Sequence, residues 1–255
     1  MSLLAVNNLT KYFGGVRALH EVTFTVGAGE IVGLIGPNGA GKTTCFNVLN
    51  GLLAPNGGSI RLAGRDLVPL PPYRRARLGL ARTFQNIQLF GGMTVLENVL
   101  TGLHQRQEVG ALAALLPLRR VRRAQEQNRR RATELLHLVA LEQKADFPAE
   151  ALAYGEQRRL EIARAMAQGP QLLLMDEPAA GLNPRETEEL MALMEQLRNL
   201  GITLLVIEHD MTLVMGLCHR VVVLDHGQVI AAGSPGEIRK NPRVIEAYLG
   251  REDEE

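Results

Sequence analysis

Residues 36–44 read GPNGAGKTT and follow the apolar run EIVGLI at 30–35. They match the pattern G-x-x-x-x-G-K-[ST] at Gly36, Gly41, Lys42 and Thr43. The glycines let the backbone curl so that several N–H groups meet phosphate oxygens, and a helix start adds positive potential there. Lys42 can reach the β- and γ-phosphates, and the Thr43 hydroxyl suits Mg²⁺. A strand, a glycine-rich loop and a helix in this order predict a nucleoside triphosphate site, with ATPase, GTPase and kinase chemistry all open.

A second apolar run, QLLLMDEP at 171–178, ends in two carboxylates. Ligand sites of open α/β sheets lie at the carboxyl ends of strands. Successive strand residues point to opposite sides, so we expect two roles: Asp176 in the Mg²⁺ shell and Glu177 as the base that orients the attacking water. His209 ends the next run, TLLVIEHD at 203–210, and either senses the γ-phosphate or is structural.

Composition bounds the remaining possibilities. The chain has 255 residues, enough for one large domain or two small ones, and its formal net charge of +1 gives no global field for nucleic acid. Cys45 and Cys218 lack metal-type spacing, so we expect reduced, buried thiols. The N-terminal sequence lacks a secretory pattern, and no apolar stretch approaches the roughly 20 residues of a spanning helix. We therefore expect a cytosolic chain, or one bound to a membrane through another subunit.

The order of apolar patterns predicts an α/β protein with a helical insertion in the middle. We expect helices in residues 42–53, through much of 94–165, and in 185–199 and 211–218. Strand patterns occur at 3–13, 22–36, 58–64, 171–178, 203–210 and 221–233.

An arginine-rich run, RRVRRAQEQNRRR at 119–131, invites other readings. On a helix its arginines cover about half the circumference, with Ala132, Leu135 and Val139 opposite. We expect a solvated helix face in preference to contact with an anionic membrane leaflet or with nucleic acid. The acidic end REDEE at 251–255 is expected to be frayed.

Five motifs in order, GPNGAGKTT, TFQ, LAYGEQRRLEIARA, LLLMDEPAAGLN and IEHD, resemble the ATP-binding cassette of ABC transporters over essentially the whole chain. No guanine-reading N-K-x-D motif is present, so the resemblance implies ATP. It implies an α/β P-loop NTPase of ABC ATPase type: a RecA-like core, an N-terminal antiparallel β subdomain and an α-helical subdomain. We predict a single domain at 1–255, with the core and β subdomain in 1–84 and 160–255 and the helical subdomain in 85–159.

The resemblance also implies roles for single residues. Phe13 would stack on adenine, with Tyr12 as the neighbour that could substitute for it. Gln85 would touch Mg²⁺ and the water and communicate with a membrane subunit. Thr43, Gln85 and Asp176 would form the metal site, and Glu177, His209 and Gln85 the catalytic set. The nucleotide's phosphates would be held by Gly36, Pro37, Asn38, Gly39, Ala40, Gly41, Lys42, Thr43 and Thr44.

The family's signature turn reads Leu-Ser-Gly-Gly-Gln and contacts nucleotide on the opposite subunit of a dimer. Here it is Leu152, Ala153, Tyr154, Gly155 and Glu156. Gly155 is kept, but Ala153 has no hydroxyl for the γ-phosphate. Tyr154 either supplies a hydroxyl or packs against the partner. We therefore expect an asymmetric pair, in which the site served by this signature is the weaker one.

The stretches RTFQNIQLFGGMTVLENVL and PRVIEAYLG resemble the larger ATPase subunit of branched-chain amino acid importers. That resemblance implies a second ATPase subunit, membrane permease subunits, a solute-binding protein acting indirectly, and a peripheral place on the cytoplasmic face of the inner membrane. No nucleic-acid partner is expected. The alternatives are another ABC system, for urea import or lipopolysaccharide export, and a soluble cassette ATPase. Soluble relatives usually carry two cassettes or a long coiled coil, and neither is present here.

Overall fold

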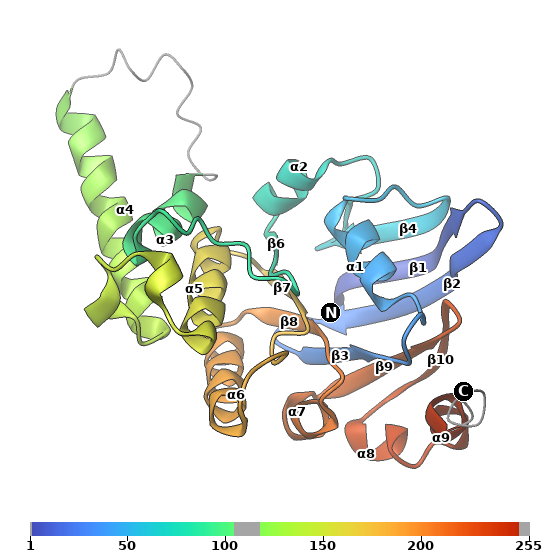
Figure 1. The fold of residues 1–255 in the computed structure, drawn as a ribbon. Helices are drawn as coiled ribbons and strands as arrows, with labels where there is room; N and C mark the ends of the chain where they lie inside the picture. The colour runs from blue at the N-terminus through green and yellow to red at the C-terminus, as the bar shows by residue number, and fades with distance from the viewer. Residues whose placement is uncertain (1, 105–117, 250–255) are drawn as a thin grey trace.

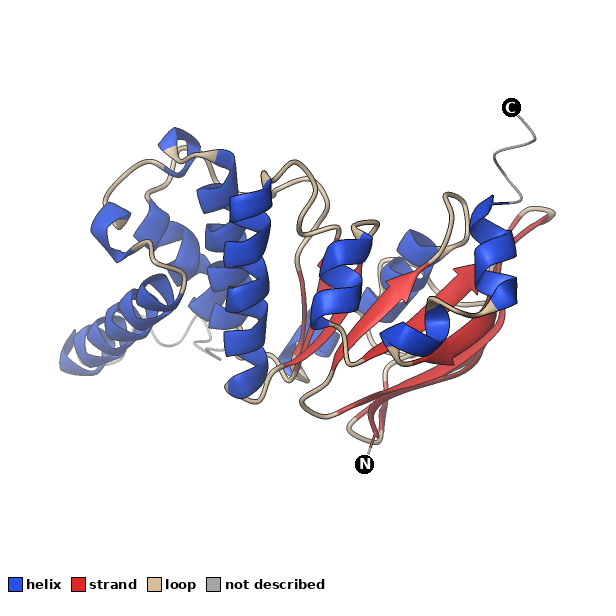
Figure 2. Ribbon diagram, turned by 90° about the horizontal axis from the view of Figure 1, so that it is seen from below, coloured by secondary structure: helices blue, strands red, loops and turns tan. Residues whose placement is uncertain are grey.

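The computed structural model describes residues 2–104 and 118–249, in two β-sheets and a group of helices (Figure 1). The acidic end at 251–255 lies outside the described residues. Figure 2 shows a group of helices without strands at one end of the molecule and the strands at the other. No helix in the described part of the chain is long and apolar enough to cross a membrane.

The central sheet is mostly parallel and has the order β10-β9-β3-β8-β7-β6, with only β10 antiparallel to its neighbour. Every residue of β3, β7 and β8 is buried, as their continuous apolar runs predict. The strands are β3 Ile31–Ile35, β6 Leu80–Arg82, β7 Leu172–Asp176, β8 Thr203–Ile207, β9 Arg220–Asp225 and β10 Gln228–Gly233.

A second, antiparallel sheet has the order β2-β1-β4-β5, as expected for the N-terminal β region. Its strands are β1 Ser2–Phe13, β2 Val16–Gly27, β4 Gly57–Leu62 and β5 Arg65–Asp66. The apolar run at 22–36 is two strands in the structure, because a turn at Gly29 separates β2 from β3. One apolar cluster joins this sheet, the central sheet and α1, Lys42–Asn50. That helix ends three residues before our prediction, at Gly51 in the left-handed conformation.

The helical region contains α3 Val95–His104, α4 Leu118–Leu138, α5 Tyr154–Ala167 and two short 3₁₀ turns, η2 Glu142–Lys144 and η3 Ala149–Ala151. A second apolar cluster connects these helices to the other face of the central sheet. Ala132 in α4 and Val139 just after it are buried, and Leu135 is partly buried. Arg122, Arg123 and Arg129 to Arg131 are exposed, so the described part of the basic run is a solvated face.

The remaining helices are α2 Pro72–Arg77, α6 Pro184–Asn199, α7 Met211–Leu217, α8 Pro235–Ile238 and α9 Pro242–Leu249. Helix α5 packs against α3, α4 and β6. The predicted subdomain limit at 159/160 lies inside α5, and the domain limits stay a prediction.

Candidate nucleotide site

The loop at 36–41 connects β3 to α1, and neighbouring backbone lies very close to two of its glycines. A Cβ on Gly36, whose φ is +151°, would lie 2.0 Å from the Leu224 carbonyl oxygen. A Cβ on Gly41, at φ +99°, would lie 2.5 Å from the Ala18 carbonyl oxygen. Only glycine fits at these two positions, which explains the spacing of the motif.

Lys42 lies inside this loop. It is buried, and its Nζ donates to the Gly36 and Pro37 carbonyl oxygens at 2.6 and 2.9 Å. Thr43 is exposed in the first turn of α1. First-turn amides have no partner within a helix, and the helix dipole is positive at that end. The loop therefore offers an ammonium, backbone donors and a hydroxyl to an anionic ligand, and phosphate binding by these residues stays a prediction.

Asp176 ends β7 and is almost fully buried. Its Oδ2 accepts a hydrogen bond from Arg82 Nη2 at 2.7 Å, and Arg82 Nη1 donates to Asn47 Oδ1 at the same distance. The guanidinium also lies 4.9 Å from the centre of the Phe84 ring. Arg82 thus connects β6, β7 and α1, a contact that our sequence analysis did not identify.

Glu177, Gln85 and His209 meet although they come from three separate loops. Gln85 Nε2 donates to Glu177 Oε2 at 2.8 Å, and His209 Nε2 lies 2.6 Å from Glu177 Oε1. Glu177 has φ +46° and lies just beyond β7, so a turn rather than strand alternation separates it from Asp176. Asp176 and Glu177 have different surroundings, as expected. The cause is the turn at Glu177 and not the alternation of side chains along a strand.

Glu208 supports this arrangement and was missed from the sequence. It is buried and accepts hydrogen bonds from the backbone N–H groups of Ala179 at 2.8 Å and His209 at 3.1 Å. Burial raises the pKa of Glu208, although these backbone donors oppose the shift. Its carboxyl group joins the loop after β7 to the loop after β8, and so fixes the separation of Glu177 and His209.

The turn at 152–156 opens α5. Ala153 is the N-cap and brings no acceptor oxygen, while Glu156 Oε2 accepts from the Ala153 N–H at 3.2 Å. Lys144 Nζ holds Glu156 Oε1 at 2.6 Å. A Cβ on Gly155 would lie 2.6 Å from Glu186 Oε1, so this glycine allows α5 to approach the start of α6.

Tyr154 contacts its own chain. Its ring lies against Gly181, where an added Cβ would come within 3.1 Å of the ring, and its hydroxyl is 3.4 Å from Arg158 Nη2. The side chain remains 44% exposed, so packing against a partner stays a prediction.

Phe13 and Tyr12 are both exposed at the end of the β1–β2 hairpin. Lys11 Nζ lies 5.2 Å from the centre of the Phe13 ring. Strand β2 is anchored beside the phosphate loop, since His20 N–H donates to the Gly227 carbonyl and Gly227 N–H to that of Ala40. Either ring is accessible to a flat ligand.

The donor set suits a magnesium ion carried by phosphates. In the described part of the chain, no group of three His, Cys, Asp or Glu residues could hold a metal unaided. Mg²⁺ commonly uses one or two carboxylates together with substrate phosphates. Thr43, Gln85 and Asp176 carry oxygen atoms of that kind, and their joint role at a metal ion stays a prediction.

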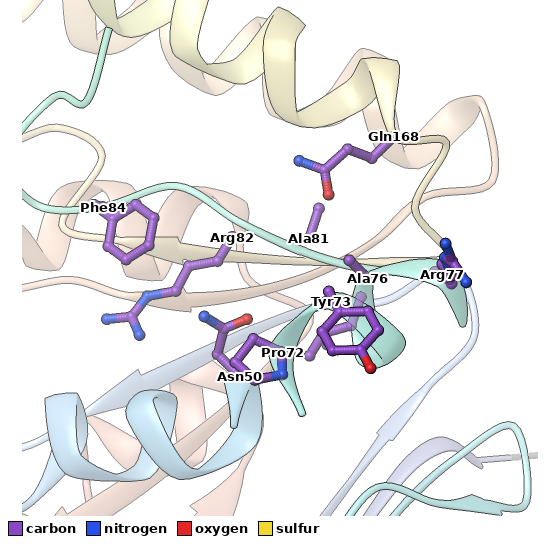
Figure 3. A pocket seen from close by; sticks show the side chains of 11 residues that line it. Asn50, Pro72, Tyr73, Ala76, Arg77, Ala81, Arg82, Phe84 and Gln168 are labelled. Atoms are coloured by element: carbon purple, nitrogen blue, oxygen red, sulfur yellow. The ribbon is translucent and has the colours of Figure 1, made fainter. Parts of the chain in front are cut away.

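A groove of about 960 Å³ lies beside this site (Figure 3). Arg82 and Phe84 line one end, and Tyr73, Arg77 and Gln168 line the other. Phe84 directly precedes Gln85, and Arg82 binds Asp176. The groove therefore reaches Phe84 in the glutamine loop and Arg82, the residue that binds Asp176.

Comparison with known proteins identifies the class. Residues 19–180 match the family model described as ABC transporter, and residues 228–254 match one described as branched-chain amino acid ATP-binding cassette transporter. The chain belongs to the ABC transporter family, as an ATP-binding cassette ATPase.

Within that family, the chain is 51% identical to the high-affinity branched-chain amino acid transport ATP-binding protein LivG of Salmonella typhimurium, over 97% of this chain and 98% of LivG. Its fold matches the ADP conformation of MJ1267, an ATP-binding cassette of an ABC transporter, with a TM-score of 0.86, 32% identity, and coverage of 98% of this chain and 100% of that one. The dimeric post-hydrolysis cassette MJ0796, bound to ADP and Pi, matches with a TM-score of 0.76 and 29% identity, over 91% of this chain and 98% of that one.

Proposed function

We propose that ATP hydrolysis by this chain powers the import of branched-chain amino acids. The proposal is supported by the likeness to LivG over nearly the full length of both chains. The separate match of residues 228–254 to a branched-chain amino acid cassette model supports the same substrate class.

The observation that carries the reaction is the meeting of Gln85, Glu177 and His209 beside the phosphate loop. Gln85 and His209 each contact one carboxylate oxygen of Glu177, which fixes the orientation of the carboxylate. In that orientation Glu177 can position a water for attack on the γ-phosphate. His209 holds the other side of that carboxylate and can respond to the γ-phosphate. Lys42 would balance phosphate charge, and Phe13 would stack on adenine.

Mg²⁺ is part of this proposal. When bound with ATP, it would neutralise charge on the β- and γ-phosphate oxygens. Thr43, Gln85 and Asp176 would hold it together with those phosphates. Arg82 orients Asp176, because it donates a hydrogen bond to one of the two carboxylate oxygens.

The partners follow from two surfaces. The turn at 152–156 would complete the nucleotide site of a second ATPase subunit, in a dimer like that of MJ0796. The groove at Tyr73, Arg82 and Phe84 would receive a permease subunit, because it reaches the Gln85 loop. The chain would then sit peripherally on the cytoplasmic face of the inner membrane, and a solute-binding protein would act through the permease.

The test is reconstitution of the chain with its permease subunits and partner ATPase in liposomes. ATP turnover should rise when a binding protein loaded with leucine, isoleucine or valine is added. The Glu177→Gln variant should bind ATP and lose this turnover. Stimulation by another class of solute, with none by branched-chain amino acids, would overturn the substrate assignment.

A further inference from the structure

Arg158 lies in the first half of α5, three residues after Gly155, and its side chain is fully buried. Its guanidinium donates four hydrogen bonds. Nη1 donates to the Phe84 carbonyl at 2.7 Å and to Glu161 Oε2 at 2.8 Å. Nη2 donates to the Gln85 carbonyl at 2.8 Å and reaches the Tyr154 hydroxyl at 3.4 Å.

Glu161 also binds the backbone of the same loop. Its Oε1 accepts from the Phe84 N–H at 3.2 Å. The backbone of Phe84 and Gln85 is thus held by three hydrogen bonds to two charged side chains of α5. The Gln85 side chain extends the other way and donates to Glu177 Oε2 at 2.8 Å.

The buried Arg158–Glu161 pair is better explained by the orientation that it gives to the Phe84–Gln85 backbone than by a contribution to folding stability. Burying both charges costs desolvation free energy that their attraction often fails to recover, and burial raises the pKa of Glu161 against the charge of Arg158. A planar guanidinium can bind two carbonyls and a carboxylate at once, which a lysine ammonium on a flexible stem cannot do in the same fixed plane.

We propose that Arg158 is a positioning residue that sets Gln85 against Glu177, and so ties this chain's own nucleotide site to the signature turn that serves the partner's site. The path runs from the Tyr154 hydroxyl through Arg158 and the Gln85 backbone to Glu177 and His209. The inference rests on the proposed roles of Gln85 and Glu177. It assigns Arg158 no contact with nucleotide.

The test is a double-mutant cycle between Arg158→Lys and Gln85→Ala in the assembled transporter. The Arg158→Lys change keeps the charge opposite Glu161 and removes the fork. We expect kcat to fall about 10- to 100-fold, the range that a misplaced catalytic group produces, with KM for ATP within about threefold. In the Gln85→Ala background the same change should have no further effect, because Arg158 acts through Gln85.

A second readout does not depend on turnover. Binding of a fluorescent ATP analogue to the full chain is titrated with Mg²⁺. Arg158→Lys and Gln85→Ala should each raise the Mg²⁺ concentration at the midpoint, by the same factor, and the double variant should match either single one. If Arg158→Lys does not fold, the neutral pair Arg158→Gln with Glu161→Gln replaces it, because it leaves no uncompensated buried charge.

Arg159→Lys is the matched control. Arg159 is the next residue of α5, and its Nη1 pairs with Glu189 at 2.9 Å, away from the Gln85 loop. Its Mg²⁺ midpoint should equal that of the unaltered chain. Two results would overturn the inference. One is a double variant in which the separate losses of kcat from Arg158→Lys and Gln85→Ala multiply, and the other is an unchanged kcat in Arg158→Lys. Absence of stimulation by branched-chain amino acids would instead count against the import function, and the cycle could still be measured on basal ATPase activity.

Discussion

Ala153 is the residue at which this signature departs most plainly from the family pattern. We expect Ala153→Ser to raise ATP turnover in the assembled transporter. A hydroxyl there would bond the γ-phosphate in the partner's site. A hydrogen bond to a charged group contributes about 1.5–3 kcal/mol, which sets an upper limit of roughly ten- to hundredfold on the gain in rate. Steady-state ATPase assays measure it. Ala151→Ser, also exposed and two residues earlier, is the control. An unchanged or lower rate would refute the asymmetry.

Glu156 gives a prediction about pH. Burial opposes ionisation, but the hydrogen bonds from Lys144 and from the Ala153 N–H outweigh it together and lower the pKa of Glu156. A carboxylate whose pKa is lowered by folding stabilises the protein above its unfolded pKa, near 4.3, and loses that contribution as the pH falls through the folded value. The Lys144 side chain is 40% exposed, so the contribution is about 1 kcal/mol at most.

The free energies of unfolding of the native chain and of the Glu156→Gln variant, measured in urea, should therefore differ most at neutral pH. The two values should converge as the pH falls below about 4. Lys144→Gln should show the same profile, because it removes the other half of the pair. A difference that stays constant from pH 7 to the acid limit of the folded state would contradict this account.

At the scale of elements, the contact of α3 with α5 depends on Gly102. A Cβ there would lie 2.4 Å from the Arg164 carbonyl oxygen and 2.8 Å from the Ala167 Cβ. We expect Gly102→Ala to lower the free energy of unfolding by about 1–3 kcal/mol, because overpacking outweighs the gain in helix propensity of about 1 kcal/mol. Chemical denaturation measures the change. Gly92→Ala, with nothing within 4 Å, should be close to neutral. A more stable Gly102→Ala chain would contradict the prediction.

Long elements could be predicted from the sequence, and short ones could not. Continuous apolar runs at 171–178 and 203–210 indicate β7 and β8 because buried parallel strands need no alternation. Strand β6 has three residues and α2 six, too few to show a period. The strand-end rule also foresaw that Glu177 and His209 would lie at one edge.

The charged residues behind the site could not be foreseen in the same way. Arg158, Glu161 and Glu208 are buried in the structure, but charged residues are usually exposed, so each reads as surface in the sequence. The only local signal was the i, i+3 spacing of Arg158 and Glu161. Likewise, the pairing of Arg82 with Asp176 depends on β6 and β7 being neighbours, which only the fold establishes.

At the scale of the whole molecule, we expect association to depend on nucleotide. Much of a cassette dimer's interface is the bound ATP, so ligand binding and dimerisation are linked by mass action. The chain carrying Glu177→Gln, mixed with its partner ATPase, should run as monomers without ATP and as a dimer with ATP and Mg²⁺. Light scattering after gel filtration measures the mass. Adding Lys42→Ala should abolish the shift, and a dimer that ignores nucleotide would contradict the prediction.

Both cysteines should be unreactive in the folded chain. Burial raises the pKa of the Cys45 thiol to about 12, and burial followed by the charge of Glu208 raises that of Cys218 to about 12. The reactive thiolate is therefore scarce at pH 8 and shielded by packing. A colorimetric thiol reagent should find no reactive group in the native protein and two per chain in denaturant. Rapid labelling of either residue without denaturant would contradict the burial.

Because both native thiols are unreactive, fluorescent dyes can be attached selectively to cysteines introduced elsewhere in the chain. Cysteines substituted for both Tyr73, at the rim of the groove, and Phe147, in the helical region, would be the two reactive anchors for a pair of dyes, since both side chains are more than half exposed. A donor and an acceptor dye on the two positions would turn the separation between them into a colour change. Movement between the two regions during a transport cycle could then be followed without removing either native cysteine.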